Sequence, residues 1–471
     1  MKGANAVVAG VAVGALAAAP AIALARYQGS PSVFIVFNLC FFALFALILP
    51  RPRLYVYGFL AALLGLGFWA KVLMHVIWAP GFVEPVGDFA NTPAEWDRAL
   101  MAASAGILGV VAVRLGHLLY AWRQREASEP EGGVPPAWFA RWRQPVWWVT
   151  VVLVIAVNAA NLQFAFFQIG VNPKLILPMR MHVLLAWLVN VGFALWMAAL
   201  VWWDYRTDSG VLHRVLIAPM IEAFFSSVSV FSRIIYPLHA GPYWLGLYER
   251  RKELGTVIKR WQFIKLIGHF LLLFALSILF VFIFRVMLYY GYMSGVPPSE
   301  PLRSHVYRTM QVQLPTLIIH RWVGLEGVLT VGATPNLGRA LLMEAITDSP
   351  KLASRSLYQR MAKVYYLSEH PRDFTFLANA GPVAVLLFSG SLVVVCAGMA
   401  LIALVLVATE EITRACTGNP FLLAVSGAAL ANVVGQTTFF YLTLIFFAQL
   451  WLAVGFLAVL QRLDSRNSRK G

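Results

Sequence analysis

Two arginine residues in separate polar segments, Arg233 and Arg321, are the side chains of this sequence best suited to holding an anionic substrate. Arg233 lies in the sequence Val-Phe-Ser-Arg-Ile-Ile-Tyr-Pro, and Arg321 lies in His-Arg-Trp-Val-Gly-Leu-Glu-Gly. A guanidinium group is always charged and can donate two hydrogen bonds to phosphate oxygens. A diphosphate leaving group needs such donors where no metal ion neutralises its charge. The pair therefore predicts a diphosphate clamp; the alternative for each is a solvated arginine or an anchor at a membrane interface.

Several side chains near these arginines are candidates for acid–base chemistry and for sugar contacts. Glu326 is a candidate general base, and Glu84 and Asp88, in a short acidic loop, are the alternatives. A tryptophan can stack on a sugar ring, and a tyrosine or histidine can bind sugar hydroxyls. The alternatives are structural histidines and an interfacial tryptophan. The candidate substrate-binding residues are His320, Trp322, Tyr236, His239 and Arg339.

No metal or cofactor is expected from the sequence. The three cysteines, Cys40, Cys396 and Cys416, have neither the spacing of metal ligands nor that of a disulfide framework. The sequence has no Gly-x-Ser-x-Gly, no His-Glu-x-x-His and no Walker loop. An enzyme of this kind would therefore need an activated substrate that a lipid carries.

The composition is that of a membrane protein. The chain has 471 residues, of which 60% are hydrophobic and 12% charged, with a mean hydropathy of +0.72. Soluble domains carry roughly 25% charged residues. The net charge of +16 is explained first by Lys and Arg in cytoplasmic loops, so no nucleic-acid partner is expected.

Repeated apolar runs predict an all-α protein with about 12 transmembrane helices, because a span needs roughly 20 apolar residues. Lys71 and His75, near the end of one run, are expected at the membrane interface. Both chain ends are expected in the cytoplasm, with basic loops on the same side. The predicted spans are 4–24, 33–49, 54–78, 99–122, 146–166, 183–203, two crossings within 212–248, then 266–290, 382–408, 421–436 and 439–460.

The chain divides into three parts around one large loop. Residues 1–290 hold the first predicted spans, 291–381 form the loop, and 382–471 hold the last spans and a basic tail. A loop of about 90 residues is longer than an unstructured connection usually is, which favours a functional role. Helical periodicity predicts amphipathic helices over 339–346 and 354–366. The charged run Glu410, Glu411 and Arg414 is expected in an inner loop after 382–408.

This layout resembles that of the bacterial O-antigen and oligosaccharide repeat-unit polymerases (Wzy type), which include the enterobacterial common antigen polymerases. Arg233 follows a proline-broken span at a short outer turn, and Arg321 lies in the large outer loop, as in that family. Ten residues separate Arg321 from Gly332, which is similar to a pattern of arginine, ten residues and glycine in some family members.

The resemblance implies a GT-C-like fold and an inverting, metal-independent glycosyltransferase in the bacterial inner membrane, with its large loop in the periplasm. The donor would be a glycan on undecaprenyl diphosphate, and the acceptor the terminal sugar of another lipid-linked repeat unit. Arg233 and Arg321 would balance the departing diphosphate. The expected partners are this lipid-linked oligosaccharide, membrane lipids and a protein that regulates chain length.

Other functions fit the same layout. An O-antigen ligase would share the donor but transfer the glycan to lipid A-core, with His320 as a candidate base. A polysaccharide flippase or exporter would use broken helices near the membrane midplane, although the sequence has no apparent internal repeat. A structural membrane scaffold is the remaining alternative. The sequence leaves these functions open, and it does not identify the sugar.

Overall fold

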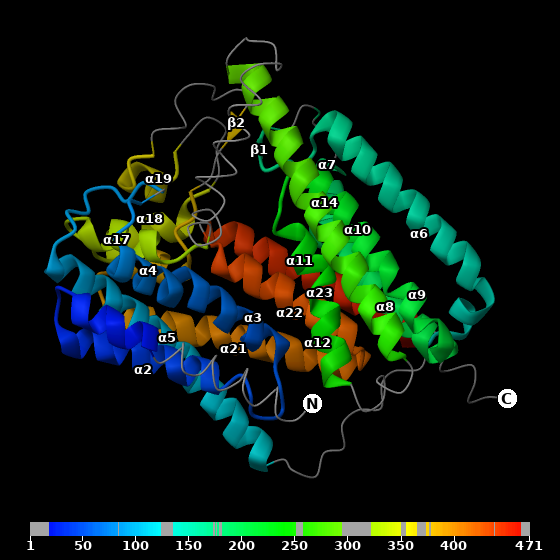
Figure 1. Cartoon of the computed structure of the whole chain (residues 1–471), viewed down its shortest axis with the longest axis horizontal. Helices are drawn as coiled ribbons and strands as arrows, with labels where there is room; N and C mark the ends of the chain where they lie inside the picture. Colours follow the sequence, from blue (N-terminus) through cyan, green and yellow to red (C-terminus); the bar gives the residue numbers. More distant parts are fainter. Residues whose placement is uncertain are drawn as a thin grey trace.

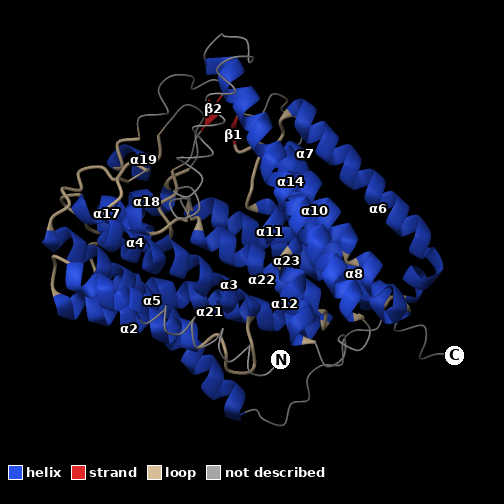
Figure 2. Ribbon diagram, in the orientation of Figure 1, coloured by secondary structure: helices blue, strands red, loops and turns tan. Residues whose placement is uncertain are grey.

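Helices, most of them apolar, make up most of the computed structural model, and the described residues also form one small sheet (Figure 2). The structure describes residues 18–82, 84–123, 135–172, 175, 177–178, 181–250, 258–293, 322–349, 355–364, 374–375, 378–437 and 439–462. The chain is therefore an all-α membrane protein with several spans. In the described part, eight stretches are long and apolar enough to cross a membrane: Tyr55–Trp78, Pro93–Arg123, Ala137–Phe164, Val183–Thr207, Ser209–Val230, Arg260–Arg285, Leu392–Thr417 and Phe440–Gln461.

Two shorter apolar helices, Pro31–Ala46 and Pro420–Gly435, add to these eight stretches. The predicted total of about 12 spans stays a prediction for two reasons. Most of the predicted span 4–24 lies outside the described residues. The segment 212–248 contains one long crossing, and the chain returns through two short helices on either side of Gly241.

Two groups of helices form the bundle, and they diverge toward the top of Figure 1. The first group comprises α2 (Pro31–Ala46), α3 (Tyr55–Leu64), the π-helix η1 (Gly65–Ala70), α4 (Lys71–Trp78), α5 (Pro93–Arg123), α21 (Leu392–Thr417), α22 (Pro420–Gly435) and α23 (Phe440–Arg462). The second group comprises α6 (Ala137–Phe164), α7 (Met181–Trp187), the π-helix η3 (Leu188–Gly192), α8 (Phe193–Thr207), the 3-10 helix η4 (Ser209–Val211), α9 (Leu212–Val215), α10 (Ile217–Val230), α11 (Ile235–Ala240), α12 (Pro242–Glu249) and α14 (Arg260–Met293).

A third set of elements belongs to the large loop and its exit. It comprises α17 (Leu325–Ala333), α18 (Arg339–Thr347), α19 (Leu357–Met361), β2 (Phe374–Thr375) and α20 (Pro382–Leu387). The predicted amphipathic helix over 339–346 is confirmed as α18. Over 354–366, the structure has only the short helix α19, which a Ser356–Gln359 capping box begins. Part of that range lies outside the described residues.

Small residues allow the central helices of the first group to pack closely. A Cβ atom on Gly109 of α5 would lie 2.2 Å from the carbonyl oxygen of Cys396 on α21, so the two backbones are nearly in contact. Gly106 of α5 likewise lets α20 approach, since a Cβ atom there would lie 2.9 Å from the Val383 side chain. Helices in lipid associate through such close van der Waals packing, because apolar burial alone gives them little driving force.

The two ends of the bundle differ in character. At one end, Arg53 pairs with Glu249 at 3.0 Å, and Arg414 donates to the carbonyl oxygen of Arg53 at 2.9 Å. We call this the basic end. The other end holds α17–α19 and the sheet, in which β1 (Gly170–Val171) pairs antiparallel with β2. We call this the loop end. The loop after α6 and the large loop therefore lie on the same side of the bundle.

The predicted span 382–408 is displaced in the structure. Residues 382–387 form the separate helix α20, and α21 begins at Leu392 and continues to Thr417, beyond the predicted end. The Ser391 side chain accepts a hydrogen bond from the backbone at its start, and Gly418, at a φ of 58°, ends it. Glu410, Glu411 and Arg414 therefore lie on a helix, and their predicted place in a loop is wrong. The Glu410 carboxylate accepts hydrogen bonds from the first two backbone N–H groups of α3, at 2.9 and 2.7 Å. Because its charge has these partners inside the protein, α21 can continue through Glu410.

Part of the large loop inserts between the spans. A Cβ atom on Gly67, near the middle of the α3–η1–α4 span, would lie 2.1 Å from the carbonyl oxygen of Val323. The Gly381 N–H donates to the carbonyl oxygen of Thr437 at 2.9 Å, just beyond the end of α22 at Gly435. The beginnings of α17 and α20 therefore reach the level of Gly67, and irregular backbone at such depth is tolerated where protein surrounds it.

Candidate functional site

A buried ion pair joins the large loop to the first group of helices. The Lys71 ammonium nitrogen lies 2.5 Å from each carboxylate oxygen of Glu326, and the two side chains are 1% and 6% exposed. Burial raises the pKa of Glu326, and the ammonium group of Lys71 opposes that rise. Removing one partner of such a pair leaves an uncompensated buried charge. The pair therefore fixes α17 against α4.

The backbone around this ion pair is shaped for close contact. The π-helix η1 ends one residue before Lys71, and π turns often occur at functional sites. Gly324, at a φ of 156°, precedes α17 and packs on Gly67. At the other end of α17, Arg98 donates to the carbonyl oxygen of Gly332 at 2.7 Å. Both ends of this helix are thus held.

The predicted site residues of the large loop have different positions. His320 and Arg321 lie outside the described residues. Trp322 is half-buried, directly before the segment that packs on Gly67. Arg339 is exposed at the start of α18. Both oxygens of Glu326 accept from Lys71, so Glu326 anchors α17 here, and its role as a general base stays a prediction.

Arg233 lies in the turn between α10 and α11, where it is half-buried. Hydrogen bonds hold this turn from both sides. The Ser227 hydroxyl donates to the carbonyl oxygen of Ser232 at 2.7 Å, and Arg285 of α14 donates to that of Phe231 at 2.8 Å. The predicted turn between two broken helices is therefore present, and the polar side chains around it bind the backbone.

Tyr236 and His239, both on α11, make buried hydrogen bonds within the protein. The Tyr236 hydroxyl donates to the carbonyl oxygen of Phe270 at 3.0 Å. His239 Nδ1 lies 3.1 and 3.2 Å from the carboxylate oxygens of Glu222, and Nε2 lies 2.8 Å from the carbonyl oxygen of Asn190. Because a carbonyl only accepts, Nε2 carries a proton and donates it. The predicted sugar contacts of both residues stay predictions.

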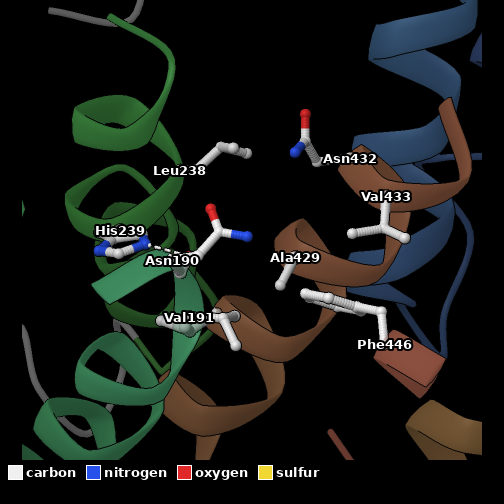
Figure 3. Close-up of a pocket in the computed structure, with 9 residues that line it drawn as sticks. Asn190, Val191, Leu238, His239, Ala429, Asn432, Val433 and Phe446 are labelled. Atoms are coloured by element: carbon white, nitrogen blue, oxygen red, sulfur yellow. Dashed lines mark hydrogen bonds between the residues drawn. The ribbon is translucent and has the colours of Figure 1, made fainter. Parts of the chain in front are cut away.

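A small pocket lies where the two groups of helices face each other, between η3 and α11 on one side and α22 and α23 on the other (Figure 3). Apolar side chains form most of its wall. Polar groups come from the side chains of Asn190 and Asn432 and from the buried edge of His239. The residues that line it are Asn190, Val191, Leu238, His239, Val425, Ala429, Asn432, Val433 and Phe446.

Sequence reasoning missed four polar residues of these sites, namely Lys71, Glu222, Asn190 and Asn432. The structure corrects the interfacial position predicted for Lys71, because its side chain is buried and paired. A signal was available, since ionisable residues inside membrane spans usually pair or mark a functional pathway. The partner could not be read from the sequence, because 255 positions separate Lys71 from Glu326.

No protein-family model, curated protein or solved structure matches this chain. Within the described residues, no group of three or more His, Cys, Asp and Glu side chains has the arrangement of a metal site.

Proposed function

We propose that this chain is a membrane glycosyltransferase that polymerises oligosaccharide repeat units carried on undecaprenyl diphosphate. The reaction takes place at the loop end, which corresponds to the periplasmic face of the bacterial inner membrane. A hydroxyl of the acceptor sugar attacks the anomeric carbon of the donor glycan. The bond from that carbon to the diphosphate breaks, a base takes the hydroxyl proton, and undecaprenyl diphosphate leaves.

One observation carries the proposal: the segments that follow the two predicted arginines both pack near the second half of α22. Arg233 precedes α11, which contacts α22 and contributes Leu238 to the pocket. Arg321 precedes Val323, which packs on Gly381, beside the end of α22. This arrangement supports two guanidinium groups that bind the same diphosphate.

The Lys71–Glu326 ion pair supports the same function through positioning. Each charge of the pair neutralises the other, so neither competes with a diphosphate for the clamp. The pair, the Gly67 contact and the Arg98 hydrogen bond hold α17 rigidly. Catalytic donors stabilise developing charge best when they are preorganised, and a fixed α17 restricts the segment directly before it.

The test is glycan synthesis by variants of the two arginines. We expect Arg321→Ala and Arg233→Ala each to lower polymer formation about 10²–10³-fold, as for other donors to a developing anion. Lysine at either position should restore only part of the activity, because an ammonium group cannot donate in the planar bidentate geometry. The matched control is Arg360→Ala, because Arg360 is exposed on α19 and pairs with the exposed Glu344.

The assay has two parts. Cells that lack the protein, complemented with each variant, are examined for long polymer and for single repeat units on the lipid carrier. Purified protein in nanodiscs is then given lipid-linked repeat units. Polymer loss with accumulation of single units outside the cytoplasm supports the proposal. Full polymer from both alanine variants would refute the proposal. Transfer of the glycan to lipid A-core in place of another repeat unit would refute it as well. So would cells with the alanine variants in which single units fail to leave the cytoplasm.

A further inference from the structure

The pocket between the two groups of helices presents two carboxamide groups to one small space. Asn190 projects into it from η3 and Asn432 from α22, while the Phe446 ring closes another side (Figure 3). The Asn190 carboxamide forms no hydrogen bond to another residue of the described chain. Asn432 accepts one from Gln436 at 2.8 Å, which leaves its NH₂ group to donate. The pocket therefore has both donors and acceptors to offer.

The position of Asn190 depends on a π turn and a buried histidine. In η3, the chain departs from the α-helical hydrogen-bond pattern, so the carbonyl oxygen of Asn190 can accept from His239 at 2.8 Å. His239 is in turn held by Glu222, which also accepts from the Ser226 hydroxyl at 2.6 Å. This chain of bonds fixes the backbone of Asn190, and its side chain then points away from His239 into the pocket.

Such an arrangement suits a polar occupant. Asn190 and Asn432 are both half-buried. A ligand that covers them removes their carboxamides from water, which is unfavourable unless the ligand supplies hydrogen bonds in return. The hydroxyl groups of sugars both donate and accept hydrogen bonds, as do the acetamido groups of N-acetylated amino sugars. The pocket is too small for a sugar ring but admits one substituent, and the Phe446 ring provides an apolar surface for its carbon atoms.

We propose that this pocket binds one hydroxyl, hydroxymethyl or acetamido substituent of the lipid-linked glycan and so selects the sugar that enters the site. This inference rests on the proposed function, since it assigns the pocket to that substrate. Asn190 and Asn432 are specificity-determining residues: they bind the glycan, and the diphosphate binds elsewhere. A site that bonds a polar substituent discriminates against a ligand without it, because its own polar groups would then be left unpaired.

The experiment compares two ligands by native mass spectrometry of the purified full-length protein. One is the lipid-linked oligosaccharide extracted from the cells that naturally make the protein, and the other is undecaprenyl diphosphate without a glycan. Asn190→Leu and Asn432→Leu should weaken binding of the first about 5–20-fold, the loss expected for one or two neutral hydrogen bonds. Binding of the second ligand should not change.

Two further variants separate a binding role from a structural one. Ala429→Leu fills the pocket from α22 without removing a polar group, and it should weaken glycan binding in the same way. The control is Gln461→Leu, which also replaces a half-buried amide with leucine, but near Thr417 at the basic end. It should bind both ligands as the unchanged protein does, and each variant is first checked for an intact melting transition.

The outcomes distinguish the two proposals. Selective loss of glycan binding in the pocket variants supports the inference. If Asn190→Leu, Asn432→Leu and Ala429→Leu all bind the glycan lipid as the unchanged protein does, the pocket holds only water and the inference falls, while the proposed function stands. If the unchanged protein binds neither ligand, the proposed function falls and this inference with it.

Discussion

Replacing Lys71 with methionine should destabilise the protein strongly at neutral pH and only weakly in mild acid. The substitution keeps the volume of the side chain but leaves the Glu326 carboxylate buried without its counter-ion. Removing one partner of a buried ion pair typically costs about 3–5 kcal/mol. The carboxyl can lower this cost by taking up a proton. The free energy of that protonation therefore sets the loss of stability.

Protonation makes the cost depend on pH. Each unit of pH above the ordinary carboxyl pKa of 4.5 adds about 1.36 kcal/mol to the cost of keeping the proton, hence about 3.4 kcal/mol at pH 7. In the variant, burial without Lys71 keeps the pKa of folded Glu326 above its unfolded value. Below the unfolded pKa the carboxyl is neutral in both states, so the variant keeps its full free energy of unfolding. As the pH rises, the unfolded state loses its proton first, and the variant loses stability. At pH 5.5 the penalty should fall to about 1.4 kcal/mol.

The assay is the free energy of unfolding in mixed detergent micelles, measured at pH 5.5 and pH 7. The double variant Lys71→Met with Glu326→Leu should recover most of the loss, because an apolar pair of similar volume often replaces a buried ion pair without cost. The control is Arg360→Met, whose ion pair with Glu344 is also 2.5 Å long but half exposed, so its loss should stay below about 1 kcal/mol.

A penalty for Lys71→Met that is the same at both pH values would refute this reasoning. A double variant as unstable as the single variant would do so as well, because the loss would then come from packing around position 71 rather than from an uncompensated carboxylate.

Three more predictions follow from the packing. Gly327→Ala should lower the melting temperature and the yield of folded protein, because its Cβ atom would lie 2.0 Å from the carbonyl oxygen of Ala380. The control Gly81→Ala, which has open space around it, should leave the melting temperature unchanged. Equal melting temperatures for the two variants would contradict the close approach. Glu410→Ala should destabilise the protein by about 2 kcal/mol or more, because it removes the cap of α3 and leaves buried N–H groups unpaired. Unfolding in detergent measures this loss. An unchanged free energy of unfolding would contradict the cap. In intact cells, an impermeant thiol reagent should label Lys363→Cys at the loop end but not Arg123→Cys at the far end of α5, and labelling in the reverse order would contradict the proposed orientation.

The helical membrane fold could be predicted from the sequence because its causes are local. A run of about 20 apolar residues satisfies its own backbone hydrogen bonds as a helix, whatever surrounds it. Helical spacing from Arg339 likewise gave the start of α18 without reference to any partner. The end of α21 was missed because Glu410 and Glu411 broke the apolar pattern, whereas the cap that Glu410 forms on α3 is more than 350 positions away in the sequence.

The candidate site could be predicted only in part. The polar turn at Arg233 was visible from Pro219, Pro237 and the serines near it. The pocket beside it was not, because Asn190 and Asn432 are single polar residues within long apolar runs and their spacing has no motif. They share a pocket only because the two groups of helices face each other there.

By itself, the sequence determined that this chain crosses a membrane several times as helices and carries one long polar loop. Hydropathy and helical periodicity are properties of neighbouring residues, so they need no tertiary structure. Only the tertiary structure decided that the loop inserts beside Gly67, that Lys71 is buried against Glu326, and that two asparagines share one pocket. Those contacts join residues far apart in the chain, and close packing of many side chains selects them together.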